Sequence, residues 1–138
     1  MIAVDSNVLV YAHRTETSLH DEALERLTAL AEGDAPWGTP AFVLAEFVRV
    51  VTHSRIFTPP TSLDVAFGFI SQLLDSPSVR LLLPGPAFPA LLEKCCRAAD
   101  ARGNLVFDAQ IAAVCQEHGV AEVLTADRDF SRFPDLRP

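Results

Sequence analysis

Two carboxylates stand where short strands are predicted to end, and their chemistry is that of metal ligands. Asp5 follows the apolar stretch Ile2–Val4, and Asp127 follows the β-branched stretch Val123–Thr125. Both stretches are typical of buried strands. Because the carboxyl ends of parallel strands meet at one edge of a sheet, we expect Asp5 and Asp127 to lie close together there.

Asp108 is a third acid, predicted near the start of a helix. Apolar residues recur at helical spacing after Gly103, and Gly119 is placed as the helix C-cap. In this position Asp108 serves either as an N-cap or as a ligand in a site at the edge of the sheet.

Glu46 lies in the segment Thr39–His53, which is also predicted to be helical. The segment begins with Thr39 and Pro40, which is typical of an N-cap followed by proline at the first helical position. The helix is apolar nearly all round, so we expect it to be buried. A buried carboxylate needs a partner, and the sequence offers either Arg49 or a cation shared with the other acids.

Clustered carboxylates indicate metal-dependent hydrolysis of phosphodiesters. Mg²⁺ takes oxygen ligands, mostly one or two carboxylates with waters, and it can activate water and stabilise developing charge. Without a cation such a cluster is repulsive and raises carboxyl pKa values, so it brings no structural advantage. Asp129 is a candidate fifth acid, and Asn7 and Thr125 are candidates for orienting the ligands.

The acids at the two strand ends also have purely structural interpretations. Asp5 could cap the first helix, although Ser6 and Asn7 can do so in its place. Asp127 could cap the short turn before Phe130. We favour the metal site because all of these acids fall at predicted element ends or inside an apolar helix.

Four sequence blocks resemble the PIN-domain ribonucleases and are most similar to the VapC toxins of bacterial toxin–antitoxin pairs. The blocks are AVDSNVLVY, Glu46 in an apolar helix, NLVFDAQIAA and VLTADRDF, in this order over essentially the whole chain. The resemblance implies an α/β fold, formed by residues 1–138 as a single PIN domain. It would be a three-layer α/β/α sandwich with a short central parallel sheet.

The resemblance also implies a function. PIN-domain toxins bind Mg²⁺ or Mn²⁺ through clustered carboxylates, cut RNA, and are neutralised by a cognate VapB-type antitoxin. Matched residue by residue, the catalytic and metal-binding quartet is Asp5, Glu46, Asp108 and Asp127, with Asp129 as a further metal ligand. Close relatives often carry a histidine just before the third acid, where this chain has Phe107.

Several arginines are predicted near the edge of this site and are candidates for contacts with RNA phosphate. Arginine is the better bidentate phosphate ligand of the two basic residues, and the chain has a single lysine, Lys94. The candidates are Arg14, Arg49, Arg55 and Arg128.

The composition is that of one globular domain: 138 residues, 49% hydrophobic and 21% charged. A net charge of −7 argues against a general nucleic-acid binder but fits a nuclease whose acids hold cations. No stretch approaches the ~18 apolar residues of a membrane span, and no signal peptide is recognisable, so we expect a cytoplasmic protein. The three cysteines have no metal-binding spacing and are expected to be buried apolar residues.

Strand and helix patterns alternate along the chain, which predicts a doubly wound α/β fold. Pro36–Gly38 is expected to be a short edge strand or an extended link, and Val79–Leu83 a strand. The helix Leu63–Leu74, capped by Thr61 and Ser62, is more apolar than a surface helix needs. It is either simply buried or, together with Phe42–Val51, covered by a second copy or a partner. We predict a homodimer with an antitoxin groove beside it.

Three other functions share parts of this pattern. A haloacid-dehalogenase phosphatase needs a second aspartate two residues after the first, where this chain has Asn7. A receiver domain needs a lysine on its last strand, whereas Lys94 lies in a predicted helix. A catalytically idle PIN fold that only binds would not need the complete set of acids.

Overall fold

A short parallel sheet of four strands lies at the centre of the structure, a computed structural model that describes residues 1–138. The strands are β1 (Ile2–Val4), β2 (Trp37–Pro40), β3 (Val79–Leu82) and β4 (Glu122–Leu124), in the order β3-β2-β1-β4. Every neighbouring pair is parallel. The carboxyl ends of β1 and β4 therefore meet at the same edge, with Val4 opposite Leu124.

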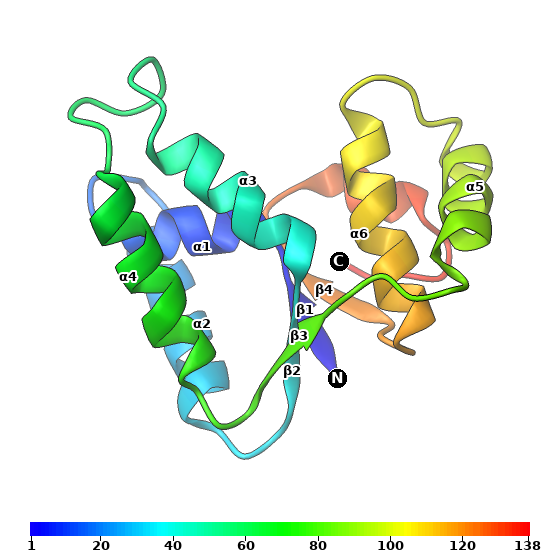
Figure 1. Cartoon of the computed structure of the whole chain (residues 1–138), viewed down its shortest axis with the longest axis horizontal. Helices are drawn as coiled ribbons and strands as arrows, with labels where there is room; N and C mark the ends of the chain where they lie inside the picture. Colours follow the sequence, from blue (N-terminus) through cyan, green and yellow to red (C-terminus); the bar gives the residue numbers. More distant parts are fainter.

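Helices cover both faces of the sheet, which confirms the predicted α/β/α layering (Figure 1). Figure 1 shows α1, α2 and α4 on one side of the sheet and α5 and α6 on the other, while α3 continues directly from β2. The helices are α1 (Ser6–His13), α2 (His20–Glu32), α3 (Ala41–Val51), α4 (Leu63–Leu74), α5 (Phe88–Ala99) and α6 (Leu105–Glu117), and a short 3₁₀ helix, η1, spans Arg128–Arg132.

The core is centred on β1 and α6. Ala3 and Val4 are fully buried between the helical layers, and α6 buries its residues from Ile111 to Cys115 without a break. The first turn of α6, which carries Asp108, lies at the surface edge, as do Gln116 and Glu117 at the other end of the helix. Of the three free thiols, those of Cys95 and Cys115 are buried as expected, whereas Cys96 is half-buried.

The prediction for β2 was wrong in two respects. The strand is internal, between β1 and β3, rather than at an edge. Thr39 and Pro40 do not begin the next helix but pair with Leu81 and Leu82 of β3. Helix α3 consequently begins at Ala41 without a side-chain cap, and the Thr39 hydroxyl is buried without a hydrogen-bond partner. Backbone pairing with β3 outweighed the local preference of a Thr-Pro pair for a helix start.

The apolar helices α3 and α4 are less buried than predicted. In α3 only Val43, Phe47 and Val51 are fully buried. Helix α4, capped by the Ser62 hydroxyl as expected, buries one stripe against the core. Other apolar side chains of this helix are exposed to between 37% and 60%. Leu63, Phe67 and Leu74 lie along one flank of the buried stripe, and Val65 lies on the opposite flank. The interpretation of α4 as a simply buried helix is therefore wrong for the single chain.

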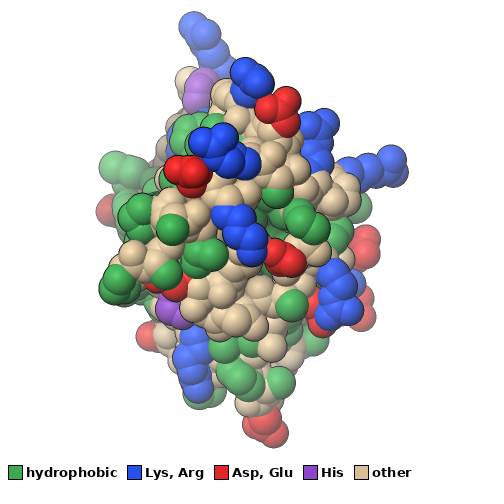
Figure 2. Space-filling model, turned by 90° about the vertical axis from the view of Figure 1, so that its right-hand side faces the viewer, with side chains coloured by type: hydrophobic (Ala, Val, Ile, Leu, Met, Phe, Trp, Pro, Cys, Tyr) green, Lys and Arg blue, Asp and Glu red, His purple; other side chains and the backbone are tan.

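Neither the face formed by α5 and α6 nor the chain end carries a patch of one charge or kind (Figure 2). On the face formed by α5 and α6, basic, acidic and apolar side chains are interspersed (Figure 2). The C-terminal tail extends the sheet beyond β4, because the Val123 N–H donates to the Arg137 carbonyl and the Arg137 N–H donates to the Ala121 carbonyl. None of the helices has both the length and the apolar character needed to cross a membrane.

Candidate functional site

The structure brings all five predicted acids to one cleft of about 910 Å³. The cleft opens at the edge where the parallel strands end, and its acids come from four separate parts of the chain. They are Asp5 after β1, Glu46 in α3, Asp108 in the first turn of α6, and Asp127 and Asp129 after β4.

Asp5 is the most buried of these acids, with 4% of its surface exposed. Its Oδ1 accepts a hydrogen bond from the Ser6 N–H at 2.7 Å, so Asp5 itself caps α1. The prediction that Ser6 and Asn7 cap this helix was wrong, since both lie inside it. The other oxygen, Oδ2, accepts from the Thr125 hydroxyl at 2.8 Å and from the Asn7 amide at 3.2 Å.

Thr125 and Asn7 tie Asp5 to the segment that follows β4. The Thr125 hydroxyl, while donating to Asp5, accepts from the Asp127 N–H at 2.9 Å and from the Asn7 amide at 3.2 Å. The side-chain oxygen of Asn7, Oδ1, accepts a hydrogen bond from the Ala126 N–H at 3.2 Å. These bonds fix the carboxylate of Asp5 and the backbone that carries Asp127. That Asn7 and Thr125 orient metal ligands in this way stays a prediction.

Asp108, Asp127 and Asp129 form the tightest cluster, with one oxygen of each lying within 4.8 Å of the others. Mg²⁺ holds its oxygen ligands at about 2.0–2.1 Å, so two ligand atoms of one ion are at most roughly 4.2 Å apart. The three carboxylates thus need only a small closure to share a cation. Asp127 also caps η1 by accepting from the Asp129 N–H at 2.8 Å, so its structural and ligand interpretations are compatible.

Three of the five acids in the cleft have no basic partner, whereas Glu46 pairs with Arg49 and Asp129 with Arg132, at 3.6 Å. Burial, and then the charges of Asp127, Asp5, Asp129 and Glu46, raise the pKa of Asp108 to about 7. Burial likewise raises the pKa of Asp5, against the lowering effect of its hydrogen bonds from Thr125 and Ser6. None of the chain's ion pairs involves Asp5, Asp108 or Asp127. A divalent cation fits this donor set, because it would supply the missing positive charge.

Glu46 has the arginine partner that the sequence offered. Arg49 donates to its carboxylate at 3.2 Å, and both side chains line the cleft. With 35% of its side chain exposed, Glu46 is not the deeply buried carboxylate that was expected. It still contributes to raising the pKa of Asp108.

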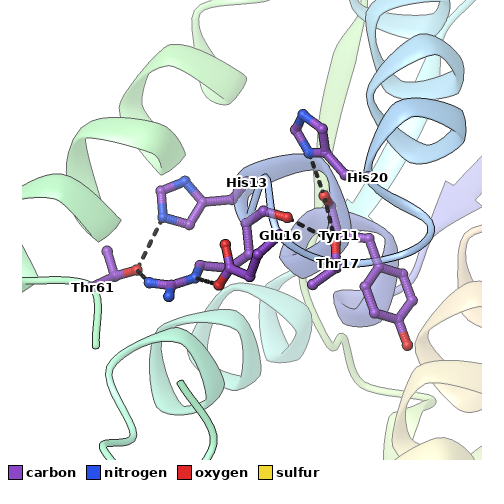
Figure 3. Close-up of polar contacts among 7 residues, drawn as sticks. Tyr11, His13, Glu16, Thr17, His20 and Thr61 are labelled. Atoms are coloured by element: carbon purple, nitrogen blue, oxygen red, sulfur yellow. Dashed lines mark hydrogen bonds and ion pairs between the residues drawn. The ribbon is translucent and has the colours of Figure 1, made fainter. Parts of the chain in front are cut away.

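The other candidate arginines lie elsewhere. Arg14 is held by the Glu16 carboxylate at 2.6 Å and by the Thr61 hydroxyl at 3.1 Å (Figure 3), and its guanidinium lies 4.5 Å from the centre of the Phe57 ring. Arg55 and Arg128 do not line the cleft either. Only Arg49, of the four, is placed to meet a substrate among the acids.

Besides Phe107, whose position the family resemblance had singled out, the walls of the cleft include residues that no sequence pattern marked as functional. Apolar and aromatic side chains make up half of its lining, and they come from α1, α3, α6 and the loop after α3. They include Tyr11, Phe42, Ile56, Phe57 and Phe107. The loop residues could not have been identified from local patterns, because their place in the cleft depends on how the chain folds back between α3 and α4.

Comparison with known proteins identifies the family. A family model described as PIN domain matches residues 2–136. VapC ribonuclease Mb2897 of Mycobacterium bovis is 43% identical over 137 residues, covering 99% of this chain and 92% of that protein.

The fold matches solved structures, among them the following two. Mycobacterium tuberculosis VapC20, described as a sarcin-ricin loop cleaving toxin, has a TM-score of 0.72, 21% identity and full coverage of both chains. VapBC2 from Rickettsia felis, bound to a promoter DNA fragment, has a TM-score of 0.71 and 18% identity, covering 99% of this chain and 96% of that one.

The raised pKa of Asp108 predicts how the metal-free protein responds to pH. The folded-state pKa of about 7 exceeds the ordinary value of 3.8, so the folded state keeps a proton that the unfolded state loses between these values. Stability should therefore fall as pH rises through this window and should recover on acidification. Thermal unfolding in EDTA is expected to give a higher Tm at pH 6 than at pH 8.

Asp108→Asn isolates this contribution from the other titrating groups. It removes the carboxyl while keeping its shape, so its Tm should rise less on acidification than that of the wild type. Burial lowers the pKa of His13, which acts in the opposite direction and is common to both proteins. Parallel pH profiles for the two proteins would contradict the electrostatic account.

Proposed function

This chain belongs to the PIN-domain family, and we propose on that basis that it is a metal-dependent endoribonuclease that acts as a toxin and is neutralised by a cognate VapB-type antitoxin. The carrying observation is the cluster of Asp108, Asp127 and Asp129, whose ligand oxygens lie within 4.8 Å of one another. The VapC relatives supply the class of reaction. RNA as substrate and Mg²⁺ or Mn²⁺ as cofactor are part of the proposal.

The residues of this cluster would hold the cation. Oxygen-only donors favour Mg²⁺ or Mn²⁺ over softer metals. When bound, such an ion would supply the positive charge that stabilises a phosphodiester undergoing hydrolysis. Asp5 and Glu46 face the same cleft and would add to the field that attracts the cation. Because the pKa of Asp108 is about 7, this carboxyl must lose its proton to become a ligand, and metal affinity should weaken below neutral pH.

The other functions weighed from the sequence gain no support. Asn7, at the position where a phosphatase would need an acid, uses its amide to hold Asp5 and Ala126. Lys94, the only lysine, pairs with Asp135 at 3.1 Å and does not line the cleft. An idle binding fold would have no use for five acids in one cleft.

Cleavage provides the first test. The wild type should cut total RNA with Mg²⁺ or Mn²⁺ and stop in EDTA, and Asp108→Asn should reduce the rate by at least about 100-fold, as loss of a group that stabilises the reaction's charge does. Mapped RNA ends measure the products. Asp100→Asn, which alters an exposed ion pair with Arg102, is the matched control and should cut normally.

Metal binding is measured alongside by thermal unfolding. Added Mg²⁺ should raise the Tm of the wild type, and Asp108→Asn should gain less. The alternative interpretation of Asp108 as an N-cap was wrong, since Asn104 is the N-cap residue of α6 and Asp108 lies inside the helix. An effect of Asp108→Asn therefore cannot come from the loss of a helix cap. Robust cutting in EDTA, or an active Asp108→Asn with an unchanged response to Mg²⁺, would refute the metal mechanism.

Association provides a second test, because one flank of α4 is unusually apolar for a free surface. We propose that this flank, formed by the exposed side chains of Leu63, Phe67 and Leu74, contributes to a homodimer, with the antitoxin bound beside it. Light scattering at tens of micromolar should give twice the 15.0 kDa mass of one chain. Phe67→Asp should shift the mass toward one chain. A monomeric wild type in the absence of a partner would count against the dimer.

A further inference from the structure

The charge of the cleft raises the question of how it would hold RNA. The chain carries a net charge of −7, and Arg49, already paired with Glu46, is the only basic residue that lines the cleft. The face formed by α5 and α6 mixes both signs of charge and shows no broad basic area (Figure 2). Lysine and arginine contacts with phosphate supply most of the affinity in ordinary nucleic-acid binders. Within the cleft, apart from a bound cation and Arg49, affinity for RNA must therefore come from contacts that are not ionic.

Apolar residues offer such contacts, since they make up half of the cleft lining. Three phenylalanines take part. The ring of Phe42 packs against that of Phe88, with centroids 5.7 Å apart, and Phe57 packs under the Arg14 guanidinium. Phe107 has neither a ring nor a cation on its face, and it is 56% exposed. It is the one phenylalanine of the cleft whose ring remains free to receive a planar group.

The position of Phe107 relates this free ring to the acids. It directly precedes Asp108 in the first turn of α6, so the two Cα atoms are about 3.8 Å apart. A phosphodiester held near Asp108 would therefore have its own nucleobases within reach of the ring. Stacking on an aromatic side chain tolerates every base, because every base presents a π face.

We propose that Phe107 is a stacking platform for an unpaired nucleobase next to the cleaved phosphodiester, so that the site takes single-stranded RNA or an unpaired loop. This inference rests on the proposed ribonuclease function. In a duplex both faces of each base are covered by its neighbours, so only an unpaired base can meet the ring. Phe107 is here a substrate-positioning residue that leaves the metal-binding acids unchanged.

The experiment compares four variants on one probe. The probe is a single-stranded oligoribonucleotide that spans a cut site mapped in total RNA. Phe107→Leu keeps an apolar side chain without the ring and should raise KM roughly 5- to 150-fold, the range that corresponds to loss of one base–aromatic stack, with little change in kcat. Phe107→Tyr and Phe107→Trp keep a ring and should stay near wild type. Leu24→Ala removes exposed apolar surface from α2, at a residue 43% exposed and outside the cleft, and should have no effect.

A base deletion in the probe shows whether the ring meets the base. One nucleotide at a time beside the cut is replaced by an abasic residue, and KM is measured for wild type and Phe107→Leu. At the stacked position the abasic probe should raise the wild-type KM by about the same factor as Phe107→Leu does. It should add little in that variant, because the two changes remove one contact.

The outcomes separate this inference from the function on which it rests. If the wild type cuts no RNA, both the ribonuclease proposal and the stacking platform are overturned. If the wild type cuts but Phe107→Leu has an unchanged KM, or the variant and abasic effects multiply independently, only the platform is overturned. An unchanged KM together with weaker antitoxin binding by Phe107→Leu would instead assign the ring to the protein partner.

Discussion

The carboxylate of Asp5 is buried at the end of β1, and the geometry of the site depends on the hydrogen bonds that this carboxylate accepts there. An ionised group that is 4% exposed is costly unless hydrogen bonds replace its water. The Ser6 N–H, the Thr125 hydroxyl and the Asn7 amide supply them. Because Thr125 follows β4, the same bonds hold β4 beside β1 at this edge. Satisfying one buried acid thus places the backbone that carries Asp127.

Of the remaining acids, Glu46 and Asp129 have arginine partners, but Asp108 and Asp127 have none. Asp108 reaches the cleft from α6, a helix whose middle is buried in the core, and its pKa rises to about 7 under burial and four neighbouring carboxylates. A fold under no functional constraint would separate such charges or pair them with arginine, as it does at the surface for Asp100 and Arg102. The repulsion among these carboxylates destabilises the folded protein unless a bound cation offsets it. Metal binding and folding should therefore be coupled in this protein.

The sequence predicted the features that depend on local pattern. These features are the short apolar strands that end just before Asp5 and Asp127 and the helix that begins just ahead of Asp108. They predicted that the acids meet where the parallel strands end. Pairings between distant segments were not predictable in this way. Thr39 and Pro40 have the local character of a helix start, yet pairing with Leu81 and Leu82 draws them into β2.

Burial and the cleft walls were harder still to predict. Helix α4 is apolar on both sides, and nothing in its sequence states which stripe faces the core. Asp129, predicted as a further metal ligand beside the quartet, lies in the tightest cluster with Asp108 and Asp127, whereas Asp5 is engaged by hydrogen bonds. The exposure of Phe107 and the hydrogen bonds that hold Arg14 at Glu16 and Thr61 follow from tertiary packing.

The measurement that tests the central claim most directly, that Asp108, Asp127 and Asp129 hold a divalent cation, is anomalous diffraction from crystals soaked in Mn²⁺. The account predicts a peak among the carboxylates of Asp108, Asp127 and Asp129 that is lost in Asp108→Asn. A cleft without a peak at saturating Mn²⁺, or a peak that persists unchanged in Asp108→Asn, would contradict it.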